Sequence, residues 1–114
     1  MKLSDAQSGW YVMDLTTMTA GTGTVTAYVD GNPVGSLSGG GVRQTHGQKM
    51  FQASSGAVSV EITGSGIIHG PFNVEDPASK GRILSSTWVV SSEDGSDNDY
   101  NDNVSRITWF MSAG

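Results

Sequence analysis

Hydrophobic and polar residues alternate with the two-residue period of a β-strand in segments that recur along the chain. The clearest case is the segment 58–62, where Val58, Val60 and Ile62 alternate with polar residues. Side chains on a strand point in turn to its two faces, so this segment would bury one face and expose the other. The 3.6-residue spacing of an amphipathic helix is nearly absent. The pattern therefore predicts an all-β protein.

Turn-forming residues interrupt the alternation at short intervals. Asp30-Gly31-Asn32-Pro33 is the strongest such signal, and glycine-rich turns are predicted at 38–41, 54–56 and 64–66, with a loop at 77–81. Between them we expect strands at residues 10–17, 22–29, 34–37, 49–53, 58–62, 83–90 and 104–110. About nine short strands joined by turns are typical of an antiparallel β-sandwich. We expect one Greek-key-like domain covering residues 1–114.

The composition excludes several classes of function. The chain has 114 residues, a formal net charge of −5 at pH 7 and no cysteine. Its six Lys and Arg residues are scattered and form no basic stripe, which argues against nucleic-acid binding. Without cysteine there is no disulfide, thiolate metal site or cysteine nucleophile. No apolar run is long enough to insert into a membrane as a helix.

Acidic residues are concentrated in the segment 93–102, which joins the last two expected strands. It holds five of the eleven acidic residues of the chain, two Asn and no Lys or Arg. Carboxylates held this close repel each other and require positive charge nearby. Calcium prefers such oxygen ligands, whereas magnesium tends to keep its waters. Two adjacent calcium ions would balance the charges of Glu93, Asp97, Asp99 and Asp102.

Other interpretations of this loop follow from the residues alone. The loop does not match the EF-hand pattern, because counting from Asp97 places Asp102 where that pattern needs Gly and Thr108 where it needs Glu. The alternatives are a solvated acidic turn, a purely structural calcium site and a glycosidase. Carboxylates so close in sequence are poorly placed to flank a sugar, and no nucleophile motif is present. We therefore expect no enzyme.

The loop also resembles a known family. The motif Ser92-Glu93-Asp94-Gly95-Ser96-Asp97-Asn98-Asp99-Tyr100-Asn101-Asp102 is similar to the signature of the calcium-mediated bacterial lectins of the LecB type, which bind fucose and mannose. The following strand, ending in Ile107-Thr108-Trp109, and the terminal Gly114 also fit. Weaker similarity runs through 22–25 and 52–61. The resemblance is close over the last quarter of the chain and loose over most of the rest.

The resemblance implies a site in which sugar hydroxyls coordinate two neighbouring calcium ions directly. It assigns one ion to Glu93, Asp97, Asp99 and Asp102, and the other to Asp99, Asn101 and Asp102. The backbone carbonyl of Met18 and the terminal carboxylate of Gly114, reaching a neighbouring subunit, are implied as further ligands. The implied sugar-binding residues are Thr19, Ala20, Gly21, Asp94, Ser96, Asp97, Asp99, Asn101 and Asp102.

The implied function is a non-catalytic lectin for mono- or oligosaccharides bearing mannose or fucose, assembled as a homodimer or homotetramer. We expect it to be secreted or on the cell surface. A cytoplasmic pool is the alternative, because the N-terminal residues Met1-Lys2-Leu3-Ser4-Asp5 lack the apolar core of a signal peptide. The alternative function is a calcium-stabilised structural or assembly module that has lost or altered sugar binding.

Two segments depart from the family pattern. The family has Asn where Met18 stands, a change that a backbone ligand tolerates, and Ala20 removes a hydroxyl from the segment that tunes sugar preference. The tail is also longer than in the family, since Gly114 lies five residues beyond Trp109. Sugar preference and the tail contact are the properties that these changes would alter.

Three tryptophans and two histidines invite a functional interpretation. Trp88 and Trp109 lie in expected strands, where core packing explains them better than stacking on sugars. Trp10 fits either role. His46 and His69 are expected at the surface or in turns, because the chain offers no third His or Cys to complete a transition-metal site.

Overall fold

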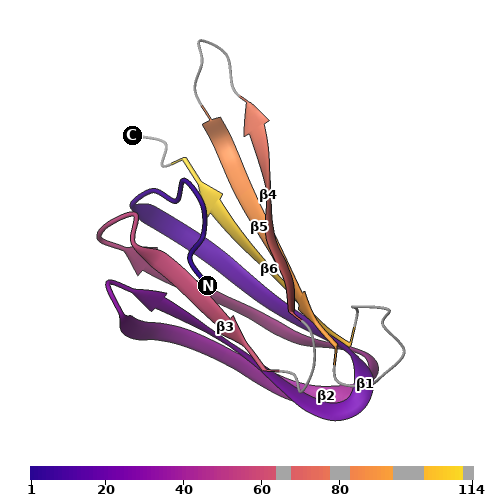
Figure 1. The fold of residues 1–114 in the computed structure, drawn as a ribbon. Helices are drawn as coiled ribbons and strands as arrows, with labels where there is room; N and C mark the ends of the chain where they lie inside the picture. Colours follow the sequence, from indigo (N-terminus) through magenta and orange to yellow (C-terminus); the bar gives the residue numbers. More distant parts are fainter. Residues whose placement is uncertain (64–67, 78–82, 94–101, 112–114) are drawn as a thin grey trace.

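The computed structural model describes residues 1–63, 68–77, 83–93 and 102–111, which form six antiparallel strands (Figure 1). The predicted all-β antiparallel sandwich is confirmed. No helix that could span a membrane occurs in these ranges. The strands are β1 (Gly9–Val29), β2 (Asn32–Ala53), β3 (Val58–Ile62), β4 (Ile68–Pro77), β5 (Ile83–Ser92) and β6 (Asn103–Phe110).

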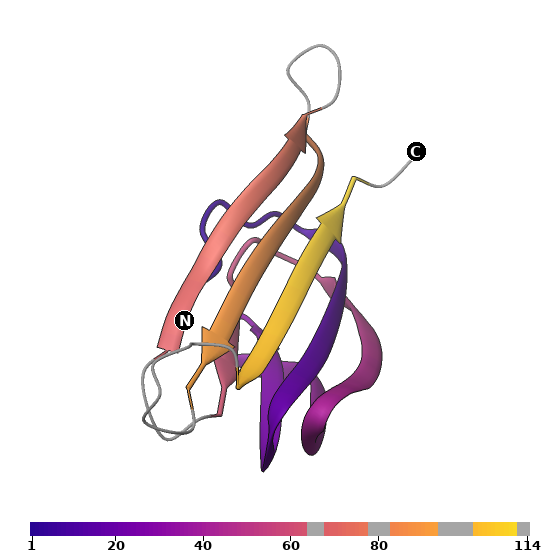
Figure 2. The same ribbon diagram turned by 90° about the vertical axis from the view of Figure 1, so that its right-hand side faces the viewer.

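β1 belongs to both layers of the sandwich. Its first half, residues 10–17, pairs with β6, and its second half, residues 25–29, pairs with β3. β2 follows β1 along both halves. One layer therefore contains β4, β5, β6, the first half of β1 and the second half of β2, side by side in Figure 2. The other layer contains β3 and the remaining halves of β1 and β2.

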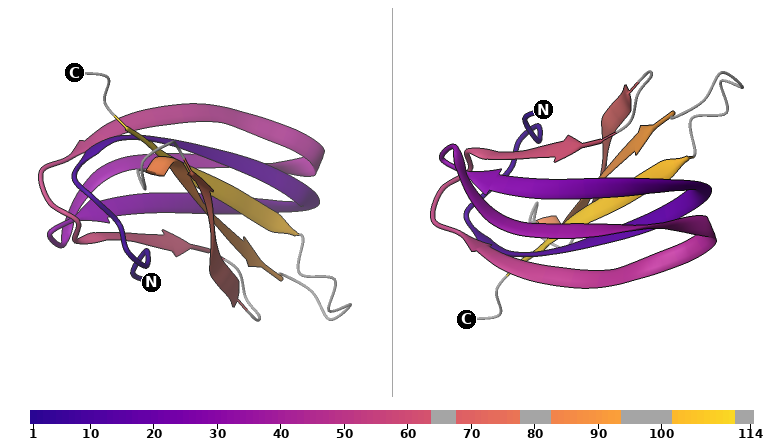
Figure 3. Two further views of the ribbon diagram at one scale, coloured as in Figure 1. Left: turned by 90° about the horizontal axis from the view of Figure 1, so that it is seen from above. Right: turned by 90° about the horizontal axis from the view of Figure 1, so that it is seen from below.

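Both long strands bend at the same end of the molecule (Figure 3). The β1–β2 register shifts between Thr17 and Thr19 and again between Thr19 and Thr22. Shifts of this kind mark β-bulges, which bend a strand and increase its twist. In β2 the bend is accompanied by positive φ angles at Gly41 (115°) and Arg43 (55°). The bend turns each strand from one layer into the other.

This bend explains why the described chain has fewer and longer strands than predicted. The expected strands 10–17 and 22–29 are the two arms of β1, and 34–37 and 49–53 lie in the two arms of β2. The turn predicted at 38–41 is wrong, because these glycines continue β2. Glycine in a strand interior permits a sharp bend as readily as a turn, and the sequence pattern does not distinguish the two.

The core lies between the layers and uses alternate residues of both arms of β1 and of β3, β5 and β6. Tyr11 and Met13 from the first arm of β1, and Val25 and Ala27 from its second arm, are all fully buried. The ring of Tyr11 stacks on Phe51 of β2 with the ring centroids 5.1 Å apart. The face prediction made for 58–62 is confirmed, because Val58, Val60 and Ile62 of β3 are buried.

The tryptophans divide between core and surface. Trp88 is 1% exposed and Trp109 is 7% exposed, which confirms the prediction of core packing. Their indole N–H groups donate to the carbonyl oxygens of Ser4 (3.0 Å) and Ser8 (2.9 Å), so both rings also hold the N-terminal segment in place. Trp10, on the outer side of β1, is 44% exposed.

β4 was not expected from the sequence. Among the described strands it is an edge strand that pairs only with β5, so few of its side chains reach the core. Phe72 and Val74 point outward, 55% and 68% exposed, and acidic Glu75 and Asp76 follow. Backbone pairing at a sheet edge needs no particular side chains, which is why the segment carries a weak signal.

Candidate metal and sugar site

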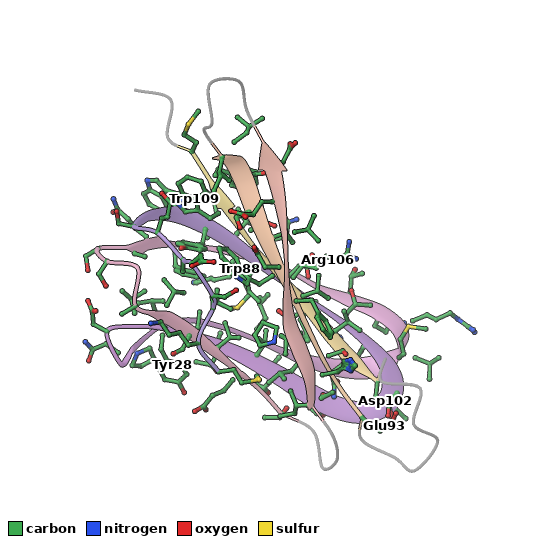
Figure 4. All side chains as sticks on the ribbon, turned by 45° about the horizontal axis from the view of Figure 1, so that its top comes forward. Tyr28, Trp88, Glu93, Asp102, Arg106 and Trp109 are labelled. Atoms are coloured by element: carbon green, nitrogen blue, oxygen red, sulfur yellow. The ribbon has the colours of Figure 1, made fainter. Side chains whose placement is uncertain are left out.

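The acidic loop leaves the sandwich at the end of β5 and returns at the start of β6. Ser92 and Asn103 pair across these strands, so the next residues, Glu93 and Asp102, lie side by side at the base of the loop (Figure 4). Glu93 is 1% exposed and Asp102 is 7% exposed. The other expected acidic-loop and tail residues lie outside the described residues, namely Asp94, Ser96, Asp97, Asp99, Asn101 and Gly114.

Burial of two neighbouring carboxylates is chemically demanding. Moving one carboxylate out of water costs on the order of several kcal/mol unless hydrogen bonds or opposite charge compensate it, and two of them repel each other. Carboxylate oxygens in such a place suit a hard divalent cation, and calcium accepts about six to eight oxygen ligands. The donor chemistry of Glu93 and Asp102 therefore fits calcium.

The bend of β1 lies against the base of this loop. The backbone N–H of Met18 donates to the carbonyl oxygen of Asp102 at 2.8 Å. Met18 and Thr19 are half-buried here, whereas Ala20 and Gly21 are exposed. The structure thus brings Met18, and with it the start of the segment from Met18 to Gly21, to Asp102, which lies 84 positions further along the chain.

A buried polar network supports the loop base, and the sequence analysis missed it. Ser92 Oγ donates to the carbonyl oxygen of Thr63 at 2.9 Å, and Asn103 Nδ2 lies 3.1 Å from Ser92 Oγ and 3.2 Å from the same carbonyl. Ser92 is 0% and Asn103 2% exposed. The signal that could have found them is a polar residue at an inward position of each strand, directly beside the loop.

Asn103 also explains a glycine in β1. A Cβ atom at Gly23 would overlap Oδ1 of Asn103, so only glycine leaves room for this amide. Oδ1 is buried and accepts no hydrogen bond within the part of the chain that the structure describes. The amide of Asn103 is consequently held by its two donor contacts and by its fit against Gly23.

The described residues alone do not complete a metal site. Across the four described ranges, no three His, Cys, Asp or Glu residues gather closely enough to hold an ion. Glu93 and Asp102 are two of the expected ligands, and the backbone of Met18 lies beside them. The remaining carboxylates of the motif belong to residues between these two.

Comparison with known proteins gives a consistent assignment. The family model described as Fucose-binding lectin II (PA-IIL) matches residues 6–111. Lectin CV2L of Chromobacterium violaceum, solved with alpha-methyl-fucoside, shares 29% identity over 94% of this chain and 92% of its own, with a TM-score of 0.72. Comparison with curated proteins gave no match.

Two more distant structures support the fold alone. The high-affinity mannose-binding lectin of Ralstonia solanacearum is 22% identical over 94% of this chain and 93% of its own, with a TM-score of 0.74. The C-terminal domain of the BC2L-C lectin from Burkholderia cenocepacia is 23% identical over 93% and 91%, with a TM-score of 0.71. Because the family model matches nearly the whole chain, this protein belongs to the fucose-binding lectin II (PA-IIL) family.

Proposed function

We propose that this protein is a calcium-dependent lectin that binds mannose- or fucose-type sugars and catalyses no reaction on them. The observation that carries the proposal is the buried pair Glu93 and Asp102 at the base of a loop with three further carboxylates. Family membership supports it. So does the 29% identical lectin solved with alpha-methyl-fucoside, since similar chains tend to keep a ligand class.

In this proposal two adjacent calcium ions are held entirely by oxygen ligands. When bound, calcium supplies coordination positions that a sugar hydroxyl can occupy in place of water. Asp94 would accept a hydrogen bond from a sugar hydroxyl with Ser96 beside it, and the segment from Thr19 to Gly21 would border the sugar. The ligands would be Glu93, Asp97, Asp99, Asn101, Asp102, the Met18 carbonyl and the Gly114 carboxylate of a neighbouring subunit.

Such a site answers a physical problem of sugar recognition. The hydroxyls of a neutral sugar are already hydrated, so exchanging water for protein hydrogen bonds gains only about 0.5–1.5 kcal/mol for each bond. A rigid base of buried side chains such as Ser92 and Asn103 would hold the loop residues in one arrangement. A fixed arrangement selects diols of matching spacing and stereochemistry, which is the basis of specificity here.

Calorimetry with methyl mannoside and methyl fucoside tests the proposal, with calcium and again after chelation. We expect binding of at least one sugar with calcium and none without it. Asp99→Ala should abolish binding because it removes a ligand shared by both ions, whereas Glu61→Ala, at an exposed position of β3 in the other layer, should leave binding unchanged. Binding that survives chelation would refute the calcium mechanism. A calcium-dependent rise in melting temperature without sugar binding would instead favour a structural module.

We also propose assembly as a homodimer or homotetramer through the outer face of the layer seen in Figure 2. Cross-strand pairing places several exposed apolar side chains on that face. They are Trp10, Met50, Phe72, Val74 and Phe110, which are 44–68% exposed. The charged residues Asp14 and Arg106 on the same face lie 4.0 Å apart and compensate each other.

The size of this face suits a dimer. Five strands spaced by ~4.8 Å, each about eight residues long, cover roughly 650 Å². A standard interface buries about 800 Å² on each partner. Packing about a two-fold axis perpendicular to the strands would run the strands of the two copies in opposite directions and bring the end of β6 towards the partner's loop. Sedimentation analysis that finds only monomer at micromolar concentration would contradict this assembly.

Calcium dependence also bears on where the protein acts. Extracellular modules bind calcium with dissociation constants of about 10⁻⁴–10⁻³ M. We propose a secreted or cell-surface location, where calcium is abundant. Fractionation of the producing cells with an antibody against this chain tests it, and protein confined to the cytoplasm would contradict it.

A further inference from the structure

The segment from Met18 to Gly21 reaches the loop base at a point where the backbone ladder is interrupted. The β1–β2 register skips Met18, Ala20 and Gly21 and shifts on both sides of Thr19. Regular pairing with β2 therefore holds this segment at Thr19 alone. Side-chain contacts at the bend must contribute to holding it.

Thr17, directly before the segment, makes such contacts. It is 0% exposed, and its Oγ1 donates to the carbonyl oxygen of Gly41 at 2.7 Å. The same Oγ1 lies 2.7 Å from Nε2 of His46. A hydroxyl has one proton and the carbonyl can only accept it, so Nε2 of His46 must be the donor in the second bond. His46 therefore carries a hydrogen on Nε2.

The ring of His46 is also confined on its other side. A Cβ atom at Gly39 would overlap the ring, so Nδ1 packs directly against the glycine backbone. Gly39 and His46 lie on opposite sides of the bend in β2, and the ring spans the distance between them. His46 is half-buried inside a strand, so the expectation of a surface or turn histidine is wrong for this residue.

The contacts continue from His46 to the loop base without interruption. His46 donates to Thr17, and the next residue, Met18, donates its backbone N–H to the carbonyl oxygen of Asp102 at 2.8 Å. β2 is thus connected through one buried side chain to the residue that precedes β6. A shift of the ring would move the backbone of Met18 relative to Asp102.

We propose that His46 is a positioning residue that acts through Thr17 to hold the segment from Met18 to Gly21 in place at Asp102, the base of the acidic loop. It thereby determines the relative affinity for fucosides and mannosides. This inference rests on the proposed function, because it concerns the same site. His46 itself touches neither sugar nor ion.

Two substitutions and one rescue test the inference. His46→Ala removes the donor, and Thr17→Val removes the hydroxyl at nearly constant volume. His46→Gln restores a donor at a similar reach. Ser55→Ala is the matched control, since it removes a 2.7 Å bond to Asp30 at the far end of the sandwich. Each variant is measured with calcium for amide hydrogen exchange and for binding of methyl fucoside and methyl mannoside.

We expect His46→Ala and Thr17→Val to speed exchange of the Met18 amide by roughly tenfold, the effect of losing one buried hydrogen bond. The ratio of the two sugar affinities should change several-fold. His46→Gln and Ser55→Ala should keep both quantities near wild type. Unchanged Met18 exchange, or equal acceleration at the core amides of Val25 and Val60, would overturn the inference.

The two proposals can fail separately. A wild-type chain that binds neither sugar refutes the proposed function and the effect on sugar preference, while Met18 exchange still decides whether His46 positions the segment. A wild-type chain that binds sugar, with the same affinity ratio in His46→Ala and Thr17→Val, refutes this inference alone. If His46→Ala does not fold, Thr17→Val supplies both readouts.

Discussion

Single residues at the loop base pack closely against the neighbouring strands. Asn103 occupies an inward position that the strand alternation would normally give to an apolar side chain, and it joins Ser92 to the carbonyl of Thr63. Its Oδ1 faces the backbone of Gly23. The polar network is rigid because each buried amide proton in it has an acceptor, and the glycine opposite gives the amide room.

Substitution of Gly23 should reveal this fit. Gly23→Ala forces a methyl group into the space of the Asn103 amide and should lower the free energy of unfolding by ~1–3 kcal/mol. In an Asn103→Ala background the same change should cost much less, because the obstructing amide is gone. Urea unfolding of the four proteins of this cycle gives the coupling energy. If the two substitutions change the free energy of unfolding additively, the contact between Gly23 and Asn103 is contradicted.

Tyr11 should make stability fall at alkaline pH. Burial raises the pKa of its hydroxyl, and a backbone hydrogen bond with Gln7 partly opposes the rise. A raised pKa means that the folded chain favours the protonated hydroxyl. This stability is full below the unfolded pKa of about 10 and is lost as pH rises through the folded pKa. Urea unfolding across that pH range should show that Tyr11→Phe loses less free energy of unfolding than the wild type as the pH rises. Equal losses in the two proteins would contradict this prediction.

Among the elements, the bent strands and the β5–β6 hairpin define the site together. The bend positions the segment after Thr17, and the hairpin positions Glu93 and Asp102 at the two ends of the acidic loop. Neither element contains the site alone. Its rigidity should therefore depend on ion binding between them, since the loop carboxylates repel one another without it.

Removal of calcium should destabilise this hairpin first. Calcium at ~100 times its dissociation constant should raise the free energy of unfolding by about 2.7 kcal/mol for each ion bound. Each ion then corresponds to a rise in melting temperature of roughly 10 °C for a domain of this size. Scanning calorimetry with calcium, with magnesium and with chelator measures it. As calcium is removed, amide hydrogen exchange should accelerate in β5 and β6 before it accelerates in β3. Equal melting temperatures in all three solutions would contradict a calcium site.

At the scale of the whole molecule, one outer face of the sandwich carries a group of exposed apolar side chains. Covering this face removes apolar surface from water at roughly 25 cal/mol for each Å². Assembly and sugar binding would be linked if the tail carboxylate of Gly114 enters a neighbouring site.

A charge on this face should separate the copies. Val74 is 68% exposed on β4, so Val74→Lys should leave the fold intact but place a charge inside the proposed interface. We expect monomers by sedimentation velocity and, if the tail completes the site, weaker sugar binding. Ser36→Lys, at an exposed position of β2 in the other layer, is the control. An unchanged oligomer in Val74→Lys would exclude this face.

Much of the fold was predictable because alternation of side chains reports directly which face of a strand is buried. The inward residues of β3, β5 and β6 follow from it, as do the buried Trp88 and Trp109. β4 and the continuity of β1 and β2 were not predictable. Backbone pairing at an edge and bulges at a bend depend on neighbouring strands, and local sequence does not encode those neighbours.

The sequence by itself determined the strand faces, the absence of thiol chemistry and the acidic motif from Ser92 to Asp102, because these depend on residue types and their spacing. Only the tertiary structure decided that Glu93 and Asp102 are buried together, that Met18 meets Asp102, and that His46 and Asn103 support this meeting. Contacts between segments far apart in the chain arise from packing of the two layers. The residue pattern of either segment alone therefore could not reveal them.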